Sequence, residues 1–172
     1  MSSSLAVVVG NPKAHSRTLA AADAVATAVA VATGLPVADR LTIDLAEYAT
    51  ELFDWSSTTV RGLVGSLGDA KLAVVASPTY KATYTGLLKA FLDWFGQTGL
   101  AGVTVVPVMV GAGPTHALAV EVHLRPVLVE IGATLPTRGL YVTEDQLGDL
   151  DAVIAAWLVH AGPLLKSSIA NT

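Results

Sequence analysis

The sequence predicts an α/β protein in which helices cover both faces of a five-stranded parallel sheet, a three-layer sandwich. Apolar, β-branched runs recur at Leu5–Val9, Leu72–Ala76 and Val103–Val110. Each run is too continuous for a strand with one wet face, so these strands belong in a sheet covered on both sides. Longer stretches with helical periodicity separate the runs. This alternation indicates parallel strands joined by right-handed crossovers.

The size and composition of the chain favour one domain, residues 1–172, with an unusually large share of apolar residues. Hydrophobic residues make up 52% of the sequence and charged residues 14%. We therefore expect a large core and an apolar interface between subunits, in a homodimer or homotetramer. The absence of cysteine excludes thiol chemistry and disulfides, so redox chemistry would need a bound cofactor. A net charge of −4 argues against nucleic acid as a partner.

The opening residues and the long apolar stretches indicate a soluble, cytoplasmic protein without a membrane partner. The start, MSSSLAVVVGNP, lacks a basic n-region, and its apolar run ends at Gly10, so it is typical of a strand. Gly, Pro and His break the low-charge stretches before they could span a bilayer.

The first half of the chain contains three predicted helices and the second strand. Residues 16–33 carry apolar residues on one face, and Gly34 supplies a left-handed cap. The second strand is predicted at Val37–Leu45. Two further helices are expected at Thr59–Leu67 and Thr83–Phe95.

The fourth predicted helix, Thr115–Ile131, is apolar on nearly every side. We expect it to be buried against the sheet and against another subunit. Pro126 lies inside it, and proline offers no N–H to the carbonyl of Val122. The helix is therefore expected to kink or bulge between these two residues.

The last elements complete a five-stranded sheet. A fifth strand is predicted at Arg138–Val142, and Thr143 with Gln146 forms a capping-box pattern that opens the last helix. For five alternating strands we expect the flavodoxin-like order 2-1-3-4-5. Ligands in such sheets bind beyond the carboxyl ends of the strands, so the loops after strands one, three and four are the candidate site.

The loop Gly10–Thr18 lies directly between a strand and a helix. The helix start offers free N–H groups, Ser16 and Thr18 add hydroxyls and Arg17 adds charge, which together suit a phosphate monoester. The loop has neither the dinucleotide-binding glycine pattern nor a Walker sequence. The alternative is that Ser16 is an ordinary helix N-cap.

The loop Ser77–Gly86 follows the third strand. Pro78 would restrict the backbone, Tyr80 offers an aromatic side chain, and the N–H groups of 79–81 could donate to a planar ring. The alternative is a plain turn in which Tyr80 and Tyr84 pack in the core.

The loop Gly111–His116 follows the fourth strand. Its glycines would allow close approach of the backbone to a ligand, and its free amides could donate to a carbonyl-rich ring. It could equally be a flexible turn. In the predicted order all three loops fall on one edge of the sheet, which favours a shared site.

Three segments resemble the NADPH-dependent FMN reductases, and in particular the branch that supplies reduced flavin to alkanesulfonate monooxygenases. Pro78–Asp93 resembles the flavin-contacting segment of that family, and Gly10–Thr18 is similar to its FMN phosphate loop. The run His116–Leu128 is similar to its fourth helix, where some members carry an inserted aromatic that forms a π-bulge; Val122 and His123 are the nearest equivalents here.

The resemblance implies FMN as ligand, NADPH or NADH as hydride donor, and a flavin-dependent monooxygenase as a partner. The cofactor-binding residues predicted from the three loops are Asn11, His15, Ser16, Arg17, Thr18, Pro78, Thr79, Tyr80, Lys81, Gly111, Ala112, Gly113 and His116. No catalytic side chain is required, because the cofactors carry the hydride chemistry. The histidines have no carboxylate or cysteine partners at ligand spacing, so no metal site is expected.

The predicted function is therefore an NAD(P)H:FMN oxidoreductase. Three alternatives stay open: a quinone or azo-dye reductase with tightly held FMN, a flavodoxin-type electron carrier, and a flavin-free interaction module. The sequence contains no motif that distinguishes NADH from NADPH.

Overall fold

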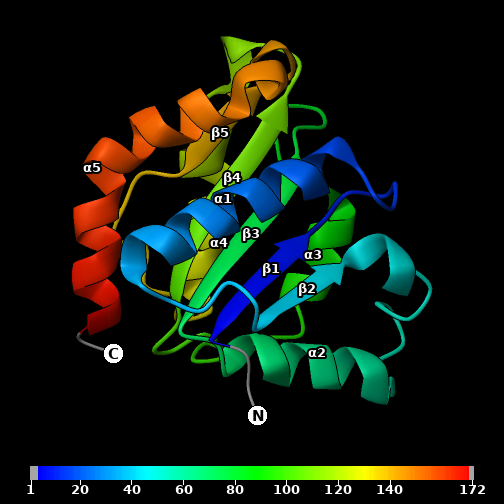
Figure 1. The fold of residues 1–172 in the computed structure, drawn as a ribbon. Coiled ribbons are helices and arrows are strands. Elements are labelled where there is room, and N and C mark those ends of the chain that lie inside the picture. The colour runs from blue at the N-terminus through cyan, green and yellow to red at the C-terminus, as the bar shows by residue number, and fades with distance from the viewer. Residues whose placement is uncertain (1–3, 171–172) are drawn as a thin grey trace.

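The protein is built around one parallel sheet with the strand order β2-β1-β3-β4-β5, as predicted (Figure 1). The computed structural model describes residues 4–170; residues 1–3 and 171–172, which belong to the expected domain 1–172, lie outside the described part. The strands are β1 (Leu5–Val9), β2 (Arg40–Asp44), β3 (Leu72–Pro78), β4 (Thr104–Gly111) and β5 (Leu140–Thr143).

Helices cover both faces of this sheet (Figure 1). The α-helices are α1 (Arg17–Thr33), α2 (Thr58–Gly68), α3 (Gly86–Leu92), α4 (Arg125–Glu130) and α5 (Leu150–Ala170). The short helical turns are η1 (Leu45–Tyr48), η2 (Pro114–His116), η3 (Val120–Leu124) and η4 (Glu144–Asp149). Helices α1 and α5 pack on one face, and α2, α3 and α4 pack on the other.

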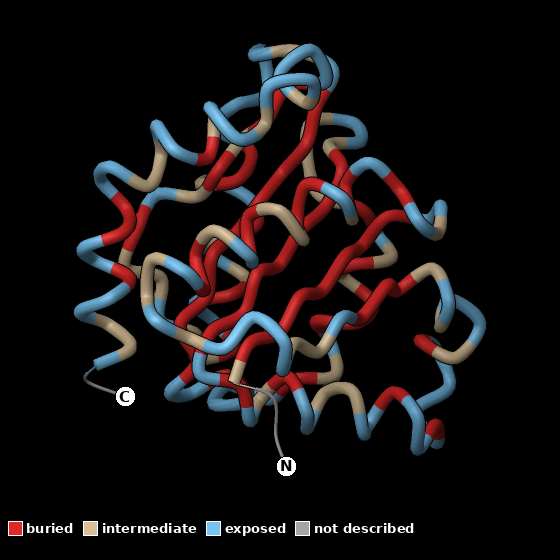
Figure 2. The backbone as a smooth tube through the Cα atoms, in the orientation of Figure 1, coloured by how far each residue is buried: buried red, intermediate tan, exposed pale blue. Residues whose placement is uncertain are grey.

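The alternation of side chains along β1 divides the core into two layers. Leu5, Val7 and Val9 pack with α1 and α5, whereas Ala6 and Val8 face the other helical layer. All five side chains are fully buried, and the sheet forms the buried centre of the molecule (Figure 2). This confirms that the apolar runs are strands covered on both sides.

The first crossover has the predicted helix and a shorter second strand. Ser16 caps α1, since its Oγ accepts the N–H of Leu19 at 3.2 Å, and Gly34 ends the helix with φ 78°. The strand predicted at Val37–Leu45 is limited to Arg40–Asp44, because β2 pairs only with the five residues of β1.

The helix predicted at Thr83–Phe95 is shorter than expected: it begins later, at Gly86, and ends earlier, at Leu92. Thr85 is its N-cap: the Thr85 Oγ1 accepts the N–H of Leu88 at 3.1 Å. The preceding residues form a small hairpin that pairs Tyr80 with Thr83, so their backbone groups are not available for helical hydrogen bonds. Helix α2 matches its predicted bounds to within one residue at each end.

The fourth helix bulges where proline was expected to disturb it. In place of one helix over Thr115–Ile131, the chain forms η2, then the π-helical turn η3 and then α4, with Pro126 in the first turn of α4. Val122 is 57% exposed, and Leu118 and Val129 are also exposed, so the second apolar face of this region is uncovered in the monomer.

The end of the chain forms a longer helical segment than its Gly and Pro residues suggested. Strand β5 begins two residues later than predicted, and Thr143 N–H donates to Gln146 Oε1 at 3.0 Å, as the capping-box pattern predicts. By length and composition alone, the segment Glu144–Ala170 is long and apolar enough to cross a membrane, despite Pro163. In this structure Ile154 and Leu165 bury one side of it in the core layer shared with α1.

Candidate functional site

The three predicted loops meet in one pocket of about 410 Å³ beyond the carboxyl ends of β1, β3 and β4. Its lining includes most of the predicted cofactor-binding residues. The lining residues are Asn11, Lys13, His15, Ser16, Arg17, Thr18, Pro78, Thr79, Tyr80, Val110, Gly111, Ala112 and Glu144. Lys13, Val110 and Glu144 also line the pocket and were not predicted.

The remaining predicted residues, Lys81, Gly113 and His116, line an adjoining pocket of about 400 Å³. Thr79 and Ala112 line both pockets, so the two hollows share a wall. The structure therefore brings every predicted residue to one edge of the sheet, divided between two neighbouring hollows.

Buried side chains hold the first loop against the start of α1. Asn11 donates from Nδ2 to Thr18 Oγ1 at 3.1 Å, and its Oδ1 accepts the N–H of Lys13 at 3.0 Å. Ser16 acts as the N-cap of α1, so the alternative prediction of an ordinary helix cap is confirmed for this residue. The N–H groups of Arg17 and Thr18 open the helix and have no carbonyl one turn earlier, which leaves them available to an anion.

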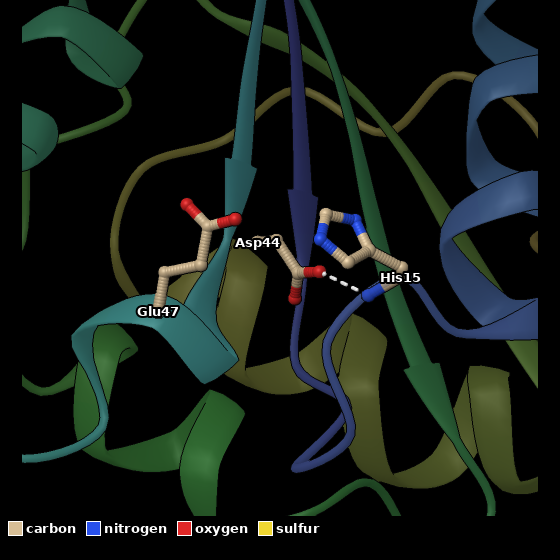
Figure 3. A group of neighbouring side chains, drawn as sticks. All are labelled: His15, Asp44 and Glu47. Atoms are coloured by element: carbon tan, nitrogen blue, oxygen red, sulfur yellow. Dashed lines mark hydrogen bonds between the residues drawn. The ribbon is translucent and has the colours of Figure 1, made fainter.

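Asp44 fixes the conformation of the same loop from the neighbouring strand. His15 has φ 51°, a left-handed backbone conformation, and its N–H donates to Asp44 Oδ2 at 2.9 Å (Figure 3). Asp44 is only 5% exposed. This hydrogen bond to a carboxylate offsets the cost of the left-handed residue.

Glu47 joins His15 and Asp44 in a cluster whose possible ligand atoms lie within 4.8 Å of one another (Figure 3). Sequence spacing missed these carboxylate partners because they come from the end of β2 and from η1. Asp44 also accepts the N–H of Ala46 in a longer bond of 3.4 Å. The Asp44 carboxylate thus has a structural role in joining the loop to η1, and the cluster needs no metal to account for its placement.

The second loop contains a two-residue hairpin. Tyr80 N–H donates to the Thr83 carbonyl at 2.9 Å, and Thr83 N–H donates to the Tyr80 carbonyl at 3.2 Å. The central residues Lys81 and Ala82 have φ 51° and 67°, as a type I′ turn requires. Tyr80 is 51% exposed at the pocket, whereas Tyr84 packs against the core, so the core alternative holds only for Tyr84.

Thr79 presents its side chain, rather than its amide, to the site. Its N–H donates to the Val110 carbonyl at 2.6 Å, and the Tyr80 N–H is used in the hairpin, so these two predicted amide donors are already occupied. Within residues 4–170, the buried Oγ1 of Thr79 has no hydrogen-bond partner. A buried hydroxyl that lines both hollows without a partner is a group that a polar ligand would satisfy.

The third loop is shaped by β5, whose residues were not predicted to reach the site. A Cβ on Gly111 would lie 1.9 Å from Tyr141 Oη, and Tyr141 Oη donates to the Gly113 carbonyl at 3.0 Å. A side chain at position 111 would therefore have to displace Tyr141, which is a reason for glycine there in addition to the predicted close approach of a ligand. The predicted strand order could have indicated this contact, because parallel strands place the end of β5 at the same edge of the sheet as the end of β4.

Glu144 also comes from the end of β5. Arg17 donates from Nη2 to Glu144 Oε1 at 2.9 Å, and both residues line the pocket. Next to it, the hydroxyl of Thr143 donates to the Asp145 carboxylate and holds the pKa of that carboxyl below its usual range. This corner of the pocket therefore combines the Arg17 guanidinium with the Glu144 carboxylate, and Asp145 follows Glu144 directly in the chain.

A doubly wound sheet of this order, with its pocket at the switch point beside β1 and β3, defines the flavodoxin-like class. Within that class the chain belongs to the NADPH-dependent FMN reductase family, whose sequence model matches residues 3–147.

Curated relatives agree with this family. The chain is 34% identical over 95 residues to an FMN reductase (NADPH) of Escherichia coli strain K12. The aligned residues cover 55% of this chain and 50% of that protein. It is 34% identical over 90 residues to the NADH-dependent FMN reductase SfnF of Pseudomonas putida, covering 52% and 48% of the two chains. These matches span about half the length of the relatives.

Solved structures extend the similarity over the whole fold. An apo NADH:FMN oxidoreductase (EMOB) superposes with a TM-score of 0.75 at 28% identity, covering 90% of this chain and 88% of that one. An oxidoreductase from Corynebacterium diphtheriae superposes with a TM-score of 0.81 at 27% identity, covering 98% and 97%.

Proposed function

We propose that this protein is an NAD(P)H-dependent FMN reductase that transfers a hydride from reduced nicotinamide to flavin. The observation that carries the proposal is the meeting of the α1 start with the loops after β3 and β4 in one pocket. The family match and the names of the relatives support the choice of flavin and nicotinamide.

The phosphate of FMN is assigned to the start of α1. Arg17 and Thr18 offer helix N–H groups there, Ser16 and Thr18 offer hydroxyls, and Arg17 adds a positive charge. Asp44 and Asn11 are positioning residues that hold the loop in shape. The residues present therefore fit a phosphate monoester.

The flavin ring is assigned to the loops Pro78–Lys81 and Gly111–Gly113. FMN, when bound, supplies the ring that accepts a hydride from nicotinamide. Thr79 Oγ1, which needs a partner, would hydrogen-bond a polar edge of that ring, and Tyr80 would border it. His15 and Ala112 complete the lining of the first pocket, and Lys81 and His116 border the second hollow, where the donor would approach. No side chain is assigned a catalytic role, and no metal is assigned.

The cellular setting follows from the resemblance and from the exposed apolar surface. We propose a single-domain, cytoplasmic protein that supplies reduced FMN to a flavin-dependent monooxygenase. Exposed Leu118, Val122 and Val129 in the fourth helical region support a homodimer or homotetramer that buries them. The relatives include enzymes named for NADPH and for NADH, and either donor is compatible with this proposal.

The test is to mix the purified protein with FMN and each reduced nicotinamide and to follow the absorbance of the nicotinamide. Flavin-dependent oxidation of NADPH or NADH is expected. A protein that binds FMN and oxidises neither is an electron carrier, which contradicts the proposal. A protein that purifies yellow and reduces quinones without added FMN is instead a reductase with tightly held flavin.

A further inference from the structure

The ion pair between Arg17 and Glu144 occupies the corner to which the flavin phosphate is assigned. We propose that Glu144 competes with this phosphate for Arg17, and so determines how weakly FMN is held and how strongly FMN is preferred over riboflavin. The inference rests on the proposed function and adds to it a specificity-determining residue from the end of β5.

The two residues reach the corner from opposite ends of the chain. Arg17 is the first residue of α1, directly after the Ser16 cap, and Glu144 is the first residue after β5. They lie 127 positions apart in the sequence, yet the guanidinium and the carboxylate meet at 2.9 Å in the pocket lining. The pairing is thus a product of the fold.

The pair is exposed enough to be exchanged. The side chains of Arg17 and Glu144 are 69% and 47% exposed. Exposed ion pairs are weak, because water screens both charges and two long side chains must be held in place. A phosphate dianion that also receives helix N–H groups would displace the carboxylate from the guanidinium.

Displacement nevertheless opposes phosphate binding in two ways. Binding must give up the Arg17–Glu144 hydrogen bond, and it leaves the Glu144 carboxylate close to the incoming phosphate. Neither effect acts on riboflavin, which lacks the phosphate. Glu144 should therefore lower the affinity for FMN alone, as suits a flavin that must leave as product.

The test compares wild type with Glu144→Gln for FMN and riboflavin binding, measured by quenching of flavin fluorescence. Glu144→Gln is expected to lower the Kd for FMN by up to roughly fivefold, the range set by one exposed ion pair. The Kd for riboflavin is expected to stay the same. Stopped-flow release should show that most of the change is slower dissociation of FMN.

Two further variants identify the cause. Asp149→Asn removes an exposed charge from the same segment without touching Arg17, and should leave both Kd values unchanged. In an Arg17→Gln background, Glu144→Gln should strengthen FMN binding less than it does in wild type, because only the repulsion between carboxylate and phosphate is then left to remove.

The outcomes separate this inference from the proposed function. If wild type binds FMN and oxidises nicotinamide but Glu144→Gln leaves the FMN Kd unchanged, or changes FMN and riboflavin equally, the competition is refuted and the function stands. If wild type binds no flavin, both are refuted.

Discussion

The hydroxyl of Tyr141 lies in the space that a side chain on Gly111 would need. A Cβ on Gly111 would come within 1.9 Å of Tyr141 Oη, and the same hydroxyl donates to the Gly113 carbonyl at 3.0 Å. Strand β5 pairs Thr143 with Gly111 and Tyr141 with Met109, which brings the ring under the loop. Tyr141 thus disfavours a side chain at position 111 and holds the carbonyl of Gly113 by a hydrogen bond.

Tyr141→Phe should loosen the loop after β4. The variant removes one hydrogen bond to a backbone carbonyl and keeps the ring, so the free energy of unfolding is expected to fall by about 1 kcal/mol. FMN binding should weaken as well, because Gly111 and Ala112 line the pocket. Urea unfolding and flavin fluorescence measure the two effects.

Tyr48→Phe is the matched control, since Tyr48 packs against the core and lines neither of the two pockets. FMN affinity in that variant should match wild type. Equal flavin affinity in Tyr141→Phe and wild type would remove Tyr141 from the site.

Arg17→Ala should weaken FMN binding without loss of fold. Arg17 is largely exposed, and a charge-assisted hydrogen bond to phosphate contributes about 1.5–3 kcal/mol, so the Kd should rise by roughly ten- to a hundredfold. The Tm without flavin should change little. Arg138→Ala, which removes an exposed arginine outside the pocket, should leave the Kd unchanged. Unaltered FMN affinity in Arg17→Ala would exclude this residue from phosphate binding.

Ala82→Gly should stabilise the hairpin of the second loop. Ala82 has φ 67°, where a Cβ costs about 1–2 kcal/mol, while glycine adds a smaller entropy cost in the unfolded chain. The free energy of unfolding is expected to rise by about 0.5–1 kcal/mol, the difference between these terms.

The same substitution inside a helix should have the opposite sign. Ala24→Gly, in the middle of α1, should lower the free energy of unfolding by about 1 kcal/mol. Chemical denaturation of the two variants side by side measures both changes. A destabilised Ala82→Gly would show that the turn carries no strain.

Asp23→Asn should stabilise the protein at neutral pH. Burial raises the pKa of the Asp23 carboxyl, and the Arg40 guanidinium opposes this shift only in part. Because the pKa is higher in the folded than in the unfolded state, ionisation of Asp23 lowers stability as pH rises through the interval between these two values. The gain in Asp23→Asn should therefore be present at neutral pH and disappear when acid protonates Asp23.

Unfolding curves from neutral to acidic pH measure this difference. Asp39→Asn, at an exposed position, is the control and should show no such pH-dependent gain. A gain in Asp23→Asn that persists below the folded pKa would contradict the explanation by burial.

The strands and the bulge in the fourth helix could be predicted because their signals are local. A run such as Leu5–Val9 is apolar at every position, which only a sheet covered on both faces accommodates. Pro126 lacks an N–H wherever the helix packs, and the π-helical turn at Val120–Leu124 precedes it. Boundaries were less certain: β2 is as short as its partner β1, which its own residues do not reveal.

The site divides in the same way between what the sequence and the tertiary structure determine. The sequence alone determined that loops after β1, β3 and β4 would share one edge, because parallel strands place their carboxyl ends together. Only the tertiary structure decided the contacts between distant segments: Asp44 with the His15 amide, Tyr141 with Gly111, and Glu144 with Arg17. Such pairs depend on register and side-chain direction across the sheet, and no local pattern of residues encodes them.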